Sequence, residues 1–321
     1  MMYKAALIGL GNIAWRFDRP APEPAAAKTQ AGAMLAHPKV ALLGGCSPSG
    51  EDRRAFGEWS SGLPAFDDVA TLLARLQPDI VGVCSPTELH FRHAAQCLEA
   101  GVRALWLEKP PAHDAGSLRE LAAIAARTKA TVLVNYIRRY LPAYERLRNA
   151  YREKRYGPCR LVRVLYSPGL ARNGVHLLDQ LFHLSNSEGY DLQWVEKTTG
   201  GSPGFSLRLD DGTLVQASGA DVPYHTNDIA LVCERGIASV LRGGKIVKTE
   251  LAGENDLFPG FYDLHDADGE DGAACPVEGY MDAALADLVR CMESGRQPRS
   301  SLASALPSQK LLEDILERAG T

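Results

Sequence analysis

The sequence predicts an α/β protein in two parts, a doubly wound parallel sheet followed by a domain with an open, mostly antiparallel sheet. An apolar run from Tyr3 to Ile8 is followed directly by Gly9 and Gly11. Apolar runs then alternate with helix-like segments as far as residue 135, and after residue 160 short strands follow one another. Strands separated by helices need crossover connections, so the first part should be parallel and the second antiparallel.

Length and composition suggest two domains of an ordinary globular protein. The 321 residues exceed the ~50 to 200 that usually form one domain, and we expect domains over 1–135 and 136–321, with the last helix able to pack back on the first. Hydrophobic residues make up 45% and charged residues 23%. The net charge of -4, without a basic block, argues against nucleic acid or an anionic membrane as a partner.

The cysteines indicate a reduced protein. They are odd in number, scattered and never in a C-x-x-C pair: Cys46, Cys84, Cys97, Cys159, Cys233, Cys275 and Cys291. Buried small hydrophobic side chains explain this pattern better than metal or redox sites do. The N-terminus lacks a signal-peptide pattern and no apolar run approaches ~18 residues, so we expect a cytoplasmic protein.

Elements of the first part follow from apolar runs and from caps. Pro20, Pro22 and Pro24 predict a loop over 15–28, with a helix over 29–36 after it. Asp67 or Asp68 is placed to cap a helix that ends at residue 76. The remaining strands are expected at 40–45, 80–84, 104–107 and 131–135, and the remaining helices at 51–59, 87–100 and 114–129.

The second part shows period-two strands and hairpin signals. Asp211-Gly212 and Gly243-Gly244 are typical of tight turns between antiparallel strands. Strands are expected at 161–166, 192–197, 205–209, 213–217, 229–233, 237–241 and 245–251. Two helices, 278–293 and 302–318, should close the chain, and residues 255–274 should be the least structured stretch.

The glycine turn is a candidate nucleotide site. Gly9, Gly11 and Ala14 match a dinucleotide fingerprint, in which small residues let the backbone and a helix N-terminus approach a pyrophosphate. Short glycine patterns also occur in ordinary turns. The strand that precedes this glycine turn and the alternating strands and helices that follow it favour dinucleotide binding.

The residues after the second strand bear on which cofactor binds. Ser47 stands where NAD sites usually carry an acidic residue, and Arg53 and Arg54 follow within one helical turn. A guanidinium there suits a 2′-phosphate, so NADP is preferred to NAD. The alternative is that both arginines are solvated helix surface.

Two further segments carry groups suited to proton chemistry. Lys109 follows the strand at 104–107 and can act there as a proton donor or charge stabiliser, although a surface lysine is the alternative. His176, Asp179 and His183 share one face of an expected helix. This set could bind a metal, but a histidine and carboxylate aligned for proton transfer is the simpler explanation, and we expect no metal.

Taken together, these motifs resemble the Gfo/Idh/MocA family, the glucose-fructose oxidoreductase and inositol dehydrogenase group. The resemblance rests on Gly9-x-Gly11-x-x-Ala14, Cys84-Ser85-Pro86-x-x-x-His90, Glu108-Lys109-Pro110, Tyr136-x-Arg138-Arg139-x-x-Pro142-Ala143 and Gly174-x-His176-x-x-Asp179. It implies an N-terminal Rossmann domain and a C-terminal α/β domain whose sheet often forms an oligomer interface, so we expect a homo-oligomer.

The resemblance also assigns roles to residues. The implied catalytic residues are Lys109, His176 and Asp179. The expected cofactor contacts are Gly9, Gly11, Asn12, Ile13, Ser85, Pro86, His90, Glu108 and Lys109, together with Ser47, Arg53 and Arg54, which are expected from the residues after the second strand and not from the resemblance. The expected substrate contacts are Lys109, Tyr136, Arg138, Asn173 and His176, together with Arg172, which is expected from its charge alone. One position departs from the family pattern, because Arg172 stands where many members have an aspartate four residues before the histidine.

The expected function is hydride transfer between NADP, or else NAD, and a secondary alcohol or ketone of a sugar, cyclitol or sugar-nucleotide-like substrate. His176 would exchange the hydroxyl proton and Lys109 would stabilise charge on the oxygen. Arg172 either binds an anionic group of the substrate or points into solvent. Two alternatives remain, a glycoside hydrolase that retains its nicotinamide and a non-catalytic NAD(P)-binding sensor on the same fold.

Overall fold

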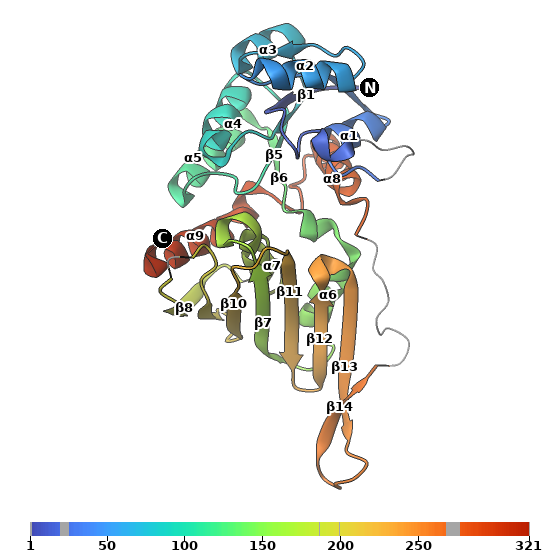
Figure 1. The fold of residues 1–321 in the computed structure, drawn as a ribbon, viewed down its shortest axis with the longest axis vertical. Helices are drawn as coiled ribbons and strands as arrows, with labels where there is room; N and C mark the ends of the chain where they lie inside the picture. The colour runs from blue at the N-terminus through green and yellow to red at the C-terminus, as the bar shows by residue number, and fades with distance from the viewer. Residues whose placement is uncertain (1, 20–25, 186, 199, 268–276, 321) are drawn as a thin grey trace. The chain divides into compact units, whose positions relative to one another are not determined.

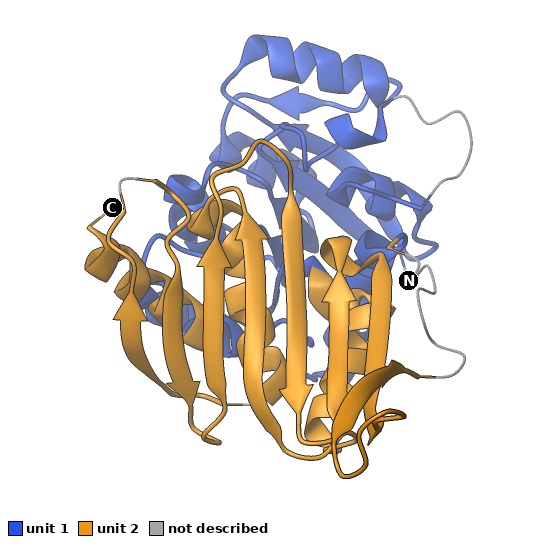
Figure 2. Cartoon of the chain, turned by 60° about the horizontal axis from the view of Figure 1, so that its bottom comes forward, with its two compact units in different colours: residues 1–137, 278–306 blue, residues 138–277, 307–321 orange. Residues whose placement is uncertain are grey.

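The computed structural model describes residues 2–19, 26–185, 187–198, 200–267 and 277–320. The chain divides into two compact units, which Figure 2 distinguishes by colour. Unit 1 comprises residues 1–137 and 278–306, and unit 2 comprises residues 138–277 and 307–321. Among the described residues, no helix combines the length and the apolar character that a membrane crossing requires.

Unit 1 contains a six-stranded sheet in the order β3-β2-β1-β4-β5-β6, in which all neighbouring strands run parallel. This order, with its reversal between β1 and β4, confirms the predicted doubly wound sheet. Its strands are β1 (Tyr3–Ile8), β2 (Val40–Cys46), β3 (Ala65–Phe66), β4 (Ile80–Val83), β5 (Ala104–Leu107) and β6 (Thr131–Val134). The two-residue β3 was not predicted because it is too short to show a pattern.

The helices of unit 1 agree with the predicted ones to within a few residues. They are α1 (Gln30–Ala36), α2 (Gly50–Trp59), α3 (Val69–Leu76), α4 (His90–Glu99) and α5 (Ala115–Thr128), with the 3-10 turns η1 (Arg16–Asp18) and η2 (Thr87–Leu89). Asp68 caps α3, since its carboxylate accepts the Thr71 N–H at 2.8 Å. The prolines at 20–24 lie outside the described residues.

One helix lies in a different unit from the one that the sequence suggested. Helix α8 (Tyr280–Ser294) falls within unit 1, where it packs against α1, β5 and β6, although we expected it in a second domain over 136–321. Its buried Met281, Leu285 and Leu288 recur at helical spacing and supply the apolar face for this packing. The unit is therefore discontinuous in sequence, which periodicity alone cannot reveal.

Unit 2 is built on an eight-stranded sheet in the order β14-β13-β12-β11-β7-β10-β9-β8 (Figure 1). Of its described strand pairs, β7 with β10 is parallel and the others are antiparallel, as the open, mostly antiparallel prediction requires. The strands are β7 (Cys159–Ser167), β8 (Tyr190–Val195), β9 (Phe205–Leu209), β10 (Leu214–Gly219), β11 (Thr226–Cys233), β12 (Gly236–Leu241), β13 (Ile246–Glu254) and β14 (Tyr262–Asp266).

Two elements of unit 2 were missed. Helix α6 (Pro142–Arg152) begins with Pro142 in its first turn, a position that tolerates proline. Strand β14 lies within residues 255–274, which we expected to be the least structured, so that expectation was wrong for residues 262–266. All five β14 residues are exposed and the strand is held by pairing with β13, so it shows no alternation of apolar and polar residues.

The remaining elements of unit 2 are turns and helices that carry several of the expected site residues. The 3-10 turn η3 (Ile137–Tyr140) leads into α6, and the π-helical turn η4 (Leu170–Gly174) leads into α7 (Val175–Ser185). The turn η5 (Arg242–Gly244) joins β12 to β13 at the predicted Gly243-Gly244 signal. Most of α9 (Leu302–Ala319) belongs to unit 2, where Tyr190 donates to Asp314 at 2.6 Å.

Candidate active site

The glycine turn after β1 lies against the end of β4. Gly9 has a φ of +85°, and a Cβ added there would meet the Ser85 nitrogen at 2.6 Å. Only glycine combines that backbone angle with such a close approach. A Cβ added to Gly11, by contrast, would meet nothing within 4 Å. The Gly11 backbone therefore borders open space, at the reversal of strand order where α/β sheets bind ligands.

The helix expected after the glycine turn is interrupted and then resumed. The Trp15 N–H donates to the Gly11 carbonyl at 3.3 Å, which completes one helical turn. The segment that connects η1 to α1 is called the excursion below, and its residues 20–25 lie outside the described part of the chain. The first N–H groups of α1 return to the same turn, because Gln30 donates to Ile13 at 3.2 Å and Ala31 donates to Ala14 at 2.8 Å. The fingerprint turn thus retains a helix behind it.

Asp18 closes the base of this excursion. Its carboxylate accepts the Lys28 N–H at 3.0 Å, the Thr29 N–H at 3.1 Å and the Thr29 hydroxyl. Thr29 in turn caps α1 by accepting the Gly32 N–H at 3.0 Å. Because this carboxylate at one end of the excursion binds the backbone at the other, the two ends are held together beside the glycine turn.

An acidic side chain from α2 lies near the end of β2, and sequence reasoning missed it. The buried Ser47 hydroxyl donates to Asp52 Oδ2 at 3.1 Å, and Asp52 also forms an ion pair with Arg16. Ser49 caps α2 by accepting the Asp52 N–H at 3.2 Å. The Ser49-x-x-Asp52 spacing resembles a capping box, and this was the signal that the acid would turn back toward the strand end.

The two arginines of the proposed 2′-phosphate site behave differently. Arg53 Nη1 donates to the Ser47 and Pro48 carbonyls at 2.7 and 3.0 Å, so this guanidinium partly holds the loop. Arg54 is exposed. Atoms of both guanidinium groups lie 3.7 to 3.8 Å from the Cβ that Gly50 would carry, so both curl over the first turn of α2.

Glu108 faces the core of unit 1. Its carboxylate accepts the Gln30 amide at 2.9 Å and the Asn135 amide at 2.7 Å, and Trp106 donates to Asn135 at 2.9 Å. Burial raises the pKa of Glu108, while the Gln30 hydrogen bond and the Lys109 charge lower it. The Glu108 carboxylate is therefore buried, and it supports the end of β5 next to Lys109. Lys109 itself is partly exposed.

His90 holds two loops of the same sheet edge together. Its Nδ1 lies 2.6 Å from the Pro110 carbonyl and its Nε2 lies 2.7 Å from the Ser85 carbonyl. His93 Nδ1 lies 3.0 Å from the Ser85 hydroxyl. His90 is 1% exposed and both of its ring nitrogens contact carbonyls, so it positions Ser85 and the loop after Lys109. Pro86, by contrast, is exposed.

In unit 2, His176 stands in the first turn of α7, directly after the π-helical turn η4. Such turns often occur at functional sites. The Asn173 amide donates to the Pro168 carbonyl at 3.0 Å and anchors η4 to the end of β7. His176 is 6% exposed and Arg172 is exposed. Asn173 thus has a positioning contact, and Arg172 projects from the turn before the histidine.

Asp179 forms a buried ion pair that the sequence did not indicate. Arg139 Nε and Nη2 donate to the two carboxylate oxygens at 2.9 and 2.6 Å, and the side chains are 3% and 0% exposed. Burial raises the pKa of Asp179, while Arg139 lowers it. Arg139 thus donates to both oxygens of the Asp179 carboxylate and ties α7 to η3 within unit 2.

The remaining expected substrate residues are buried. Tyr136 is 0% exposed in unit 1, and Arg138 is 5% exposed in unit 2. Arg138 hydrogen-bonds Tyr144, whose pKa burial raises and Arg138 lowers. The Tyr144 hydroxyl reaches Asn227 Oδ1 at 3.2 Å. Arg138 therefore contributes a second buried cation close to the Arg139–Asp179 pair.

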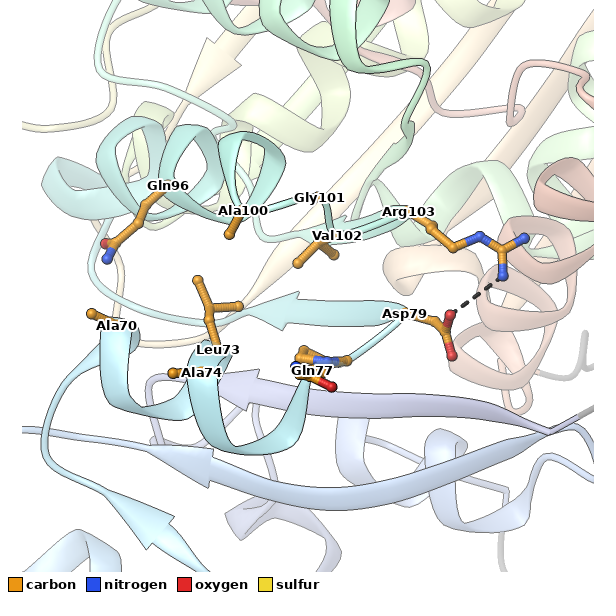
Figure 3. Close-up of a pocket in the computed structure, with 11 residues that line it drawn as sticks. Ala70, Leu73, Ala74, Gln77, Asp79, Gln96, Ala100, Gly101, Val102 and Arg103 are labelled. Atoms are coloured by element: carbon orange, nitrogen blue, oxygen red, sulfur yellow. Dashed lines mark hydrogen bonds and ion pairs between the residues drawn. The ribbon is translucent and has the colours of Figure 1, made fainter.

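A surface hollow of about 610 Å³ lies elsewhere on unit 1, between α3 and α4 (Figure 3). Its walls include Leu73, Gln96 and Val102, and an ion pair of 3.3 Å joins Asp79 to Arg103 at its rim. Asp79 and Arg103 precede β4 and β5, so the hollow opens at the amino ends of these strands. Ligands of such sheets bind at the carboxyl ends, where Gly9 and Lys109 lie.

Comparison with known proteins identifies the family. Residues 3–136 match the model described as "Oxidoreductase family, NAD-binding Rossmann fold", known as GFO_IDH_MocA. Over these residues, the chain is similar to this family. The match covers the glycine turn and the Glu108-Lys109-Pro110 segment, so the resemblance inferred from those motifs is confirmed.

Individual relatives show how far the likeness extends. D-glucoside 3-dehydrogenase of Escherichia coli is 26% identical over 145 residues, which cover 45% of this chain and 38% of the relative. The chain thus spans well under two thirds of that relative. The structure of UDP-N-acetylglucosamine 3-dehydrogenase GnnA from Acidithiobacillus ferrooxidans aligns with a TM-score of 0.79 at 18% identity, covering 99% of this chain and 97% of the other.

A second solved structure is that of KijD10, a 3-ketoreductase from Actinomadura kijaniata, in complex with NADP. It aligns with a TM-score of 0.77 at 17% identity and covers 99% of this chain and 97% of the other. At such identities these two alignments establish that both units share the fold of dehydrogenases and reductases.

The Arg139–Asp179 pair leads to a prediction about stability. Asp179→Asn should lower the free energy of unfolding by about 3 kcal/mol or more, because it leaves a buried guanidinium without its counter-charge. Replacing both partners, with Arg139→Met and Asp179→Leu together, should recover most of the loss. Urea denaturation followed by fluorescence measures both. A variant with unchanged stability but strongly reduced turnover would instead give Asp179 the catalytic role first expected of it.

Proposed function

We propose that this protein is an NADP-preferring oxidoreductase acting on a secondary alcohol or ketone of a sugar, cyclitol or sugar-nucleotide-like substrate. The observation that carries the proposal is Lys109, a partly exposed ammonium at the carboxyl end of β5, on the sheet edge that carries the glycine turn. Relatives named as a glucoside dehydrogenase, a UDP-sugar dehydrogenase and a 3-ketoreductase support the substrate class.

The glycine turn fits a dinucleotide. The open space at Gly11 leaves its backbone accessible, and Gly9 brings the turn against Ser85. In the proposal, residues 9–13 hold the pyrophosphate, while Ser85 and Pro86 border the cofactor and His90 keeps them in place. The nicotinamide, when bound, accepts or supplies the hydride. Glu108 contributes by fixing the end of β5 through Gln30 and Asn135.

The protein's own residues then manage proton and charge. Lys109 stabilises negative charge on the reacting oxygen, and His176 takes or returns the hydroxyl proton. An imidazole is suited to this task because its ordinary pKa lies near ~6.5. Each such group typically contributes about 10²- to 10⁴-fold in rate. Asp179 is reassigned to holding α7 through Arg139.

Arg172 is proposed to select the substrate. Its exposed guanidinium projects from η4, next to Asn173, which anchors that turn to the end of β7. It replaces the carboxylate that many family members have before the histidine. A guanidinium favours a substrate with a carboxylate or phosphate through paired hydrogen bonds. In this proposal, Tyr136 and Arg138 support the substrate side from within the protein.

These roles predict a split between turnover and substrate affinity. Lys109→Ala should lower kcat by about 10²-fold or more, because its charge is needed as the oxygen reacts. Arg172→Ala should mainly raise KM, and should do so more for an anionic substrate than for a neutral analogue. Absorbance of reduced nicotinamide measures both. The exposed Lys245 offers a control, since Lys245→Ala should change neither constant. An active Lys109→Ala protein would refute the assignment.

The NADP preference is attributed to Arg54, with Arg53 beside it, over the first turn of α2. Arg16 neutralises Asp52, the acid that would otherwise repel a 2′-phosphate. Arg54→Ala should weaken NADP binding by about tenfold, since a charged hydrogen bond contributes ~1.5 to 3 kcal/mol, and should leave NAD binding unchanged. Calorimetric titration measures both cofactors, with Arg75→Ala as a matched exposed arginine. Equal losses for NADP and NAD would contradict this preference.

We also propose that the protein associates with a second copy through the open face of the unit 2 sheet. Figure 2 shows this face without any of the described helices of unit 2 over it. Leu165 and Trp194 are 41% and 54% exposed there, and charges of both signs accompany them, including Arg163 and Asp228. A face that combines exposed apolar side chains with charges of both signs is suited to a two-fold interface of about 800 Å² per partner.

Leu165→Arg should therefore shift the protein toward the monomer in light scattering coupled to size-exclusion chromatography. The reason is that each copy would bring one arginine into the interface, where the two charges would repel each other or would lose their water without a counter-charge. Leu35→Arg is the matched control, because Leu35 is 56% exposed on α1 in unit 1. If both variants keep the oligomer of the parent protein, the open face is not its interface.

A further inference from the structure

Two cysteines that are far apart in sequence lie directly opposite each other in the unit 2 sheet. Cys159 opens β7 and Cys233 ends β11, and the antiparallel register pairs them. The Glu234 N–H donates to the Pro158 carbonyl at 3.2 Å, so the ladder hydrogen bond lies beyond the two cysteines and they form a non-hydrogen-bonded pair. In such pairs the Cα atoms are about 4.5 Å apart, within the ~4.4 to 6.8 Å that a disulfide spans.

A bulge brings these two residues together. Val232 lies opposite Leu161, but the next residue of β11, Cys233, lies opposite Cys159, so Arg160 is an extra residue in β7. In a regular antiparallel ladder Cys233 would lie opposite Arg160, and the thiols would not face each other. Bulges of this kind re-aim side chains and are common at functional positions.

Both thiols are reduced and partly exposed in this structure. By contrast, Cys46, Cys84 and Cys97 are buried, and burial raises the pKa of all three thiols. Reagents in solution can therefore reach the cross-strand pair far more readily than these three cysteines. The scattered spacing in the sequence hid the pair, because only strand register places residues 159 and 233 side by side.

The two thiols are electrostatically unequal. A hydrogen bond from Cys159 lowers the pKa of Cys233 and correspondingly raises that of Cys159, whose burial adds to the increase. The Cys159 thiol can also donate to the Leu161 carbonyl at 3.6 Å. Once Cys233 ionises, its sulfur is the stronger acceptor, so Cys233 is suited to attack and Cys159 to follow.

We propose that Cys159 and Cys233 form a reversible disulfide by thiol–disulfide exchange with a small-molecule disulfide. The Cys233 thiolate attacks one sulfur of that disulfide, forms a mixed disulfide and releases one thiolate. Cys159 then loses its proton and attacks the Cys233 sulfur, which releases the second small thiol. The protein loses two hydrogens, and the small disulfide is reduced to two thiols. Nothing in this chemistry depends on the proposed oxidoreductase activity.

The experiment incubates the full-length protein with glutathione disulfide, traps remaining thiols with an alkylating agent after acid quenching, and maps peptides by mass spectrometry. Cys275, which lies outside the described residues, is replaced by serine in every protein so that it cannot contribute. We expect a cross-link between residues 159 and 233 that dithiothreitol reverses. Retention of both thiols, or a mixed disulfide at Cys233 that never resolves, would overturn the proposal.

Single variants test the order of the two steps. Cys159→Ser keeps a hydroxyl that can donate to Cys233, so it should accumulate a stable glutathione adduct at Cys233. Cys159→Ala removes that donor and should form the adduct more slowly. Cys233→Ser should react about tenfold more slowly than Cys159→Ser. Cys291→Ser, which changes a buried cysteine of unit 1, should form the cross-link as the parent does. Equal rates for Cys159→Ser and Cys233→Ser would contradict the assigned roles.

Discussion

The close approach of Gly9 to Ser85 is the constraint on which the ligand edge of unit 1 depends. Because no side chain fits between these two backbones, the ends of β1 and β4 meet directly. His90 then connects the Ser85 carbonyl to the Pro110 carbonyl and so carries this contact to the loop after β5. Lys109 stands beside that loop. A close backbone approach at the glycine turn and the two contacts of the His90 ring therefore connect this turn to the loop beside Lys109.

Each unit also buries one carboxylate behind a candidate catalytic group, but the two are stabilised differently. Glu108 accepts hydrogen bonds from two neutral amides, and Asp179 receives both nitrogens of a guanidinium. Burial raises the pKa of both acids. Each acid also interacts with a neighbouring cation, Glu108 with Lys109 and Asp179 with Arg138, and both interactions lower the pKa of the acid.

The sequence was sufficient for features that local chemistry determines. Strands showed as apolar runs, Asp68 was one of two aspartates predicted to cap α3, and the glycine turn marked the candidate nucleotide edge. Tertiary partners were not predictable in this way. Arg139 meets Asp179 across 40 residues, and α8 joins unit 1 after most of unit 2 has intervened in the chain.

Strand register and side-chain direction explain the other features that the sequence did not predict. The β14 strand has no buried face, so alternation could not reveal it, and the pairing of Cys159 with Cys233 depends on one extra residue in β7. Asp52 is absent from the strand end itself, because the acid reaches Ser47 from the following helix. In each case the feature depends on how strands pair or on where a side chain points, and the spacing of residues along one element does not give this information.

The helix behind the glycine turn is interrupted, and the two ends of the interruption are each fixed to the rest of unit 1. Gln30 and Ala31 rejoin the turn through their own backbone hydrogen bonds, and Asp18 ties the two ends of the excursion together. The length of chain between those ends can change at small entropic cost, since loop closure varies only slowly with length. A change in the number of residues between Asp18 and Lys28 should therefore leave the backbone hydrogen bonds that support the glycine turn intact.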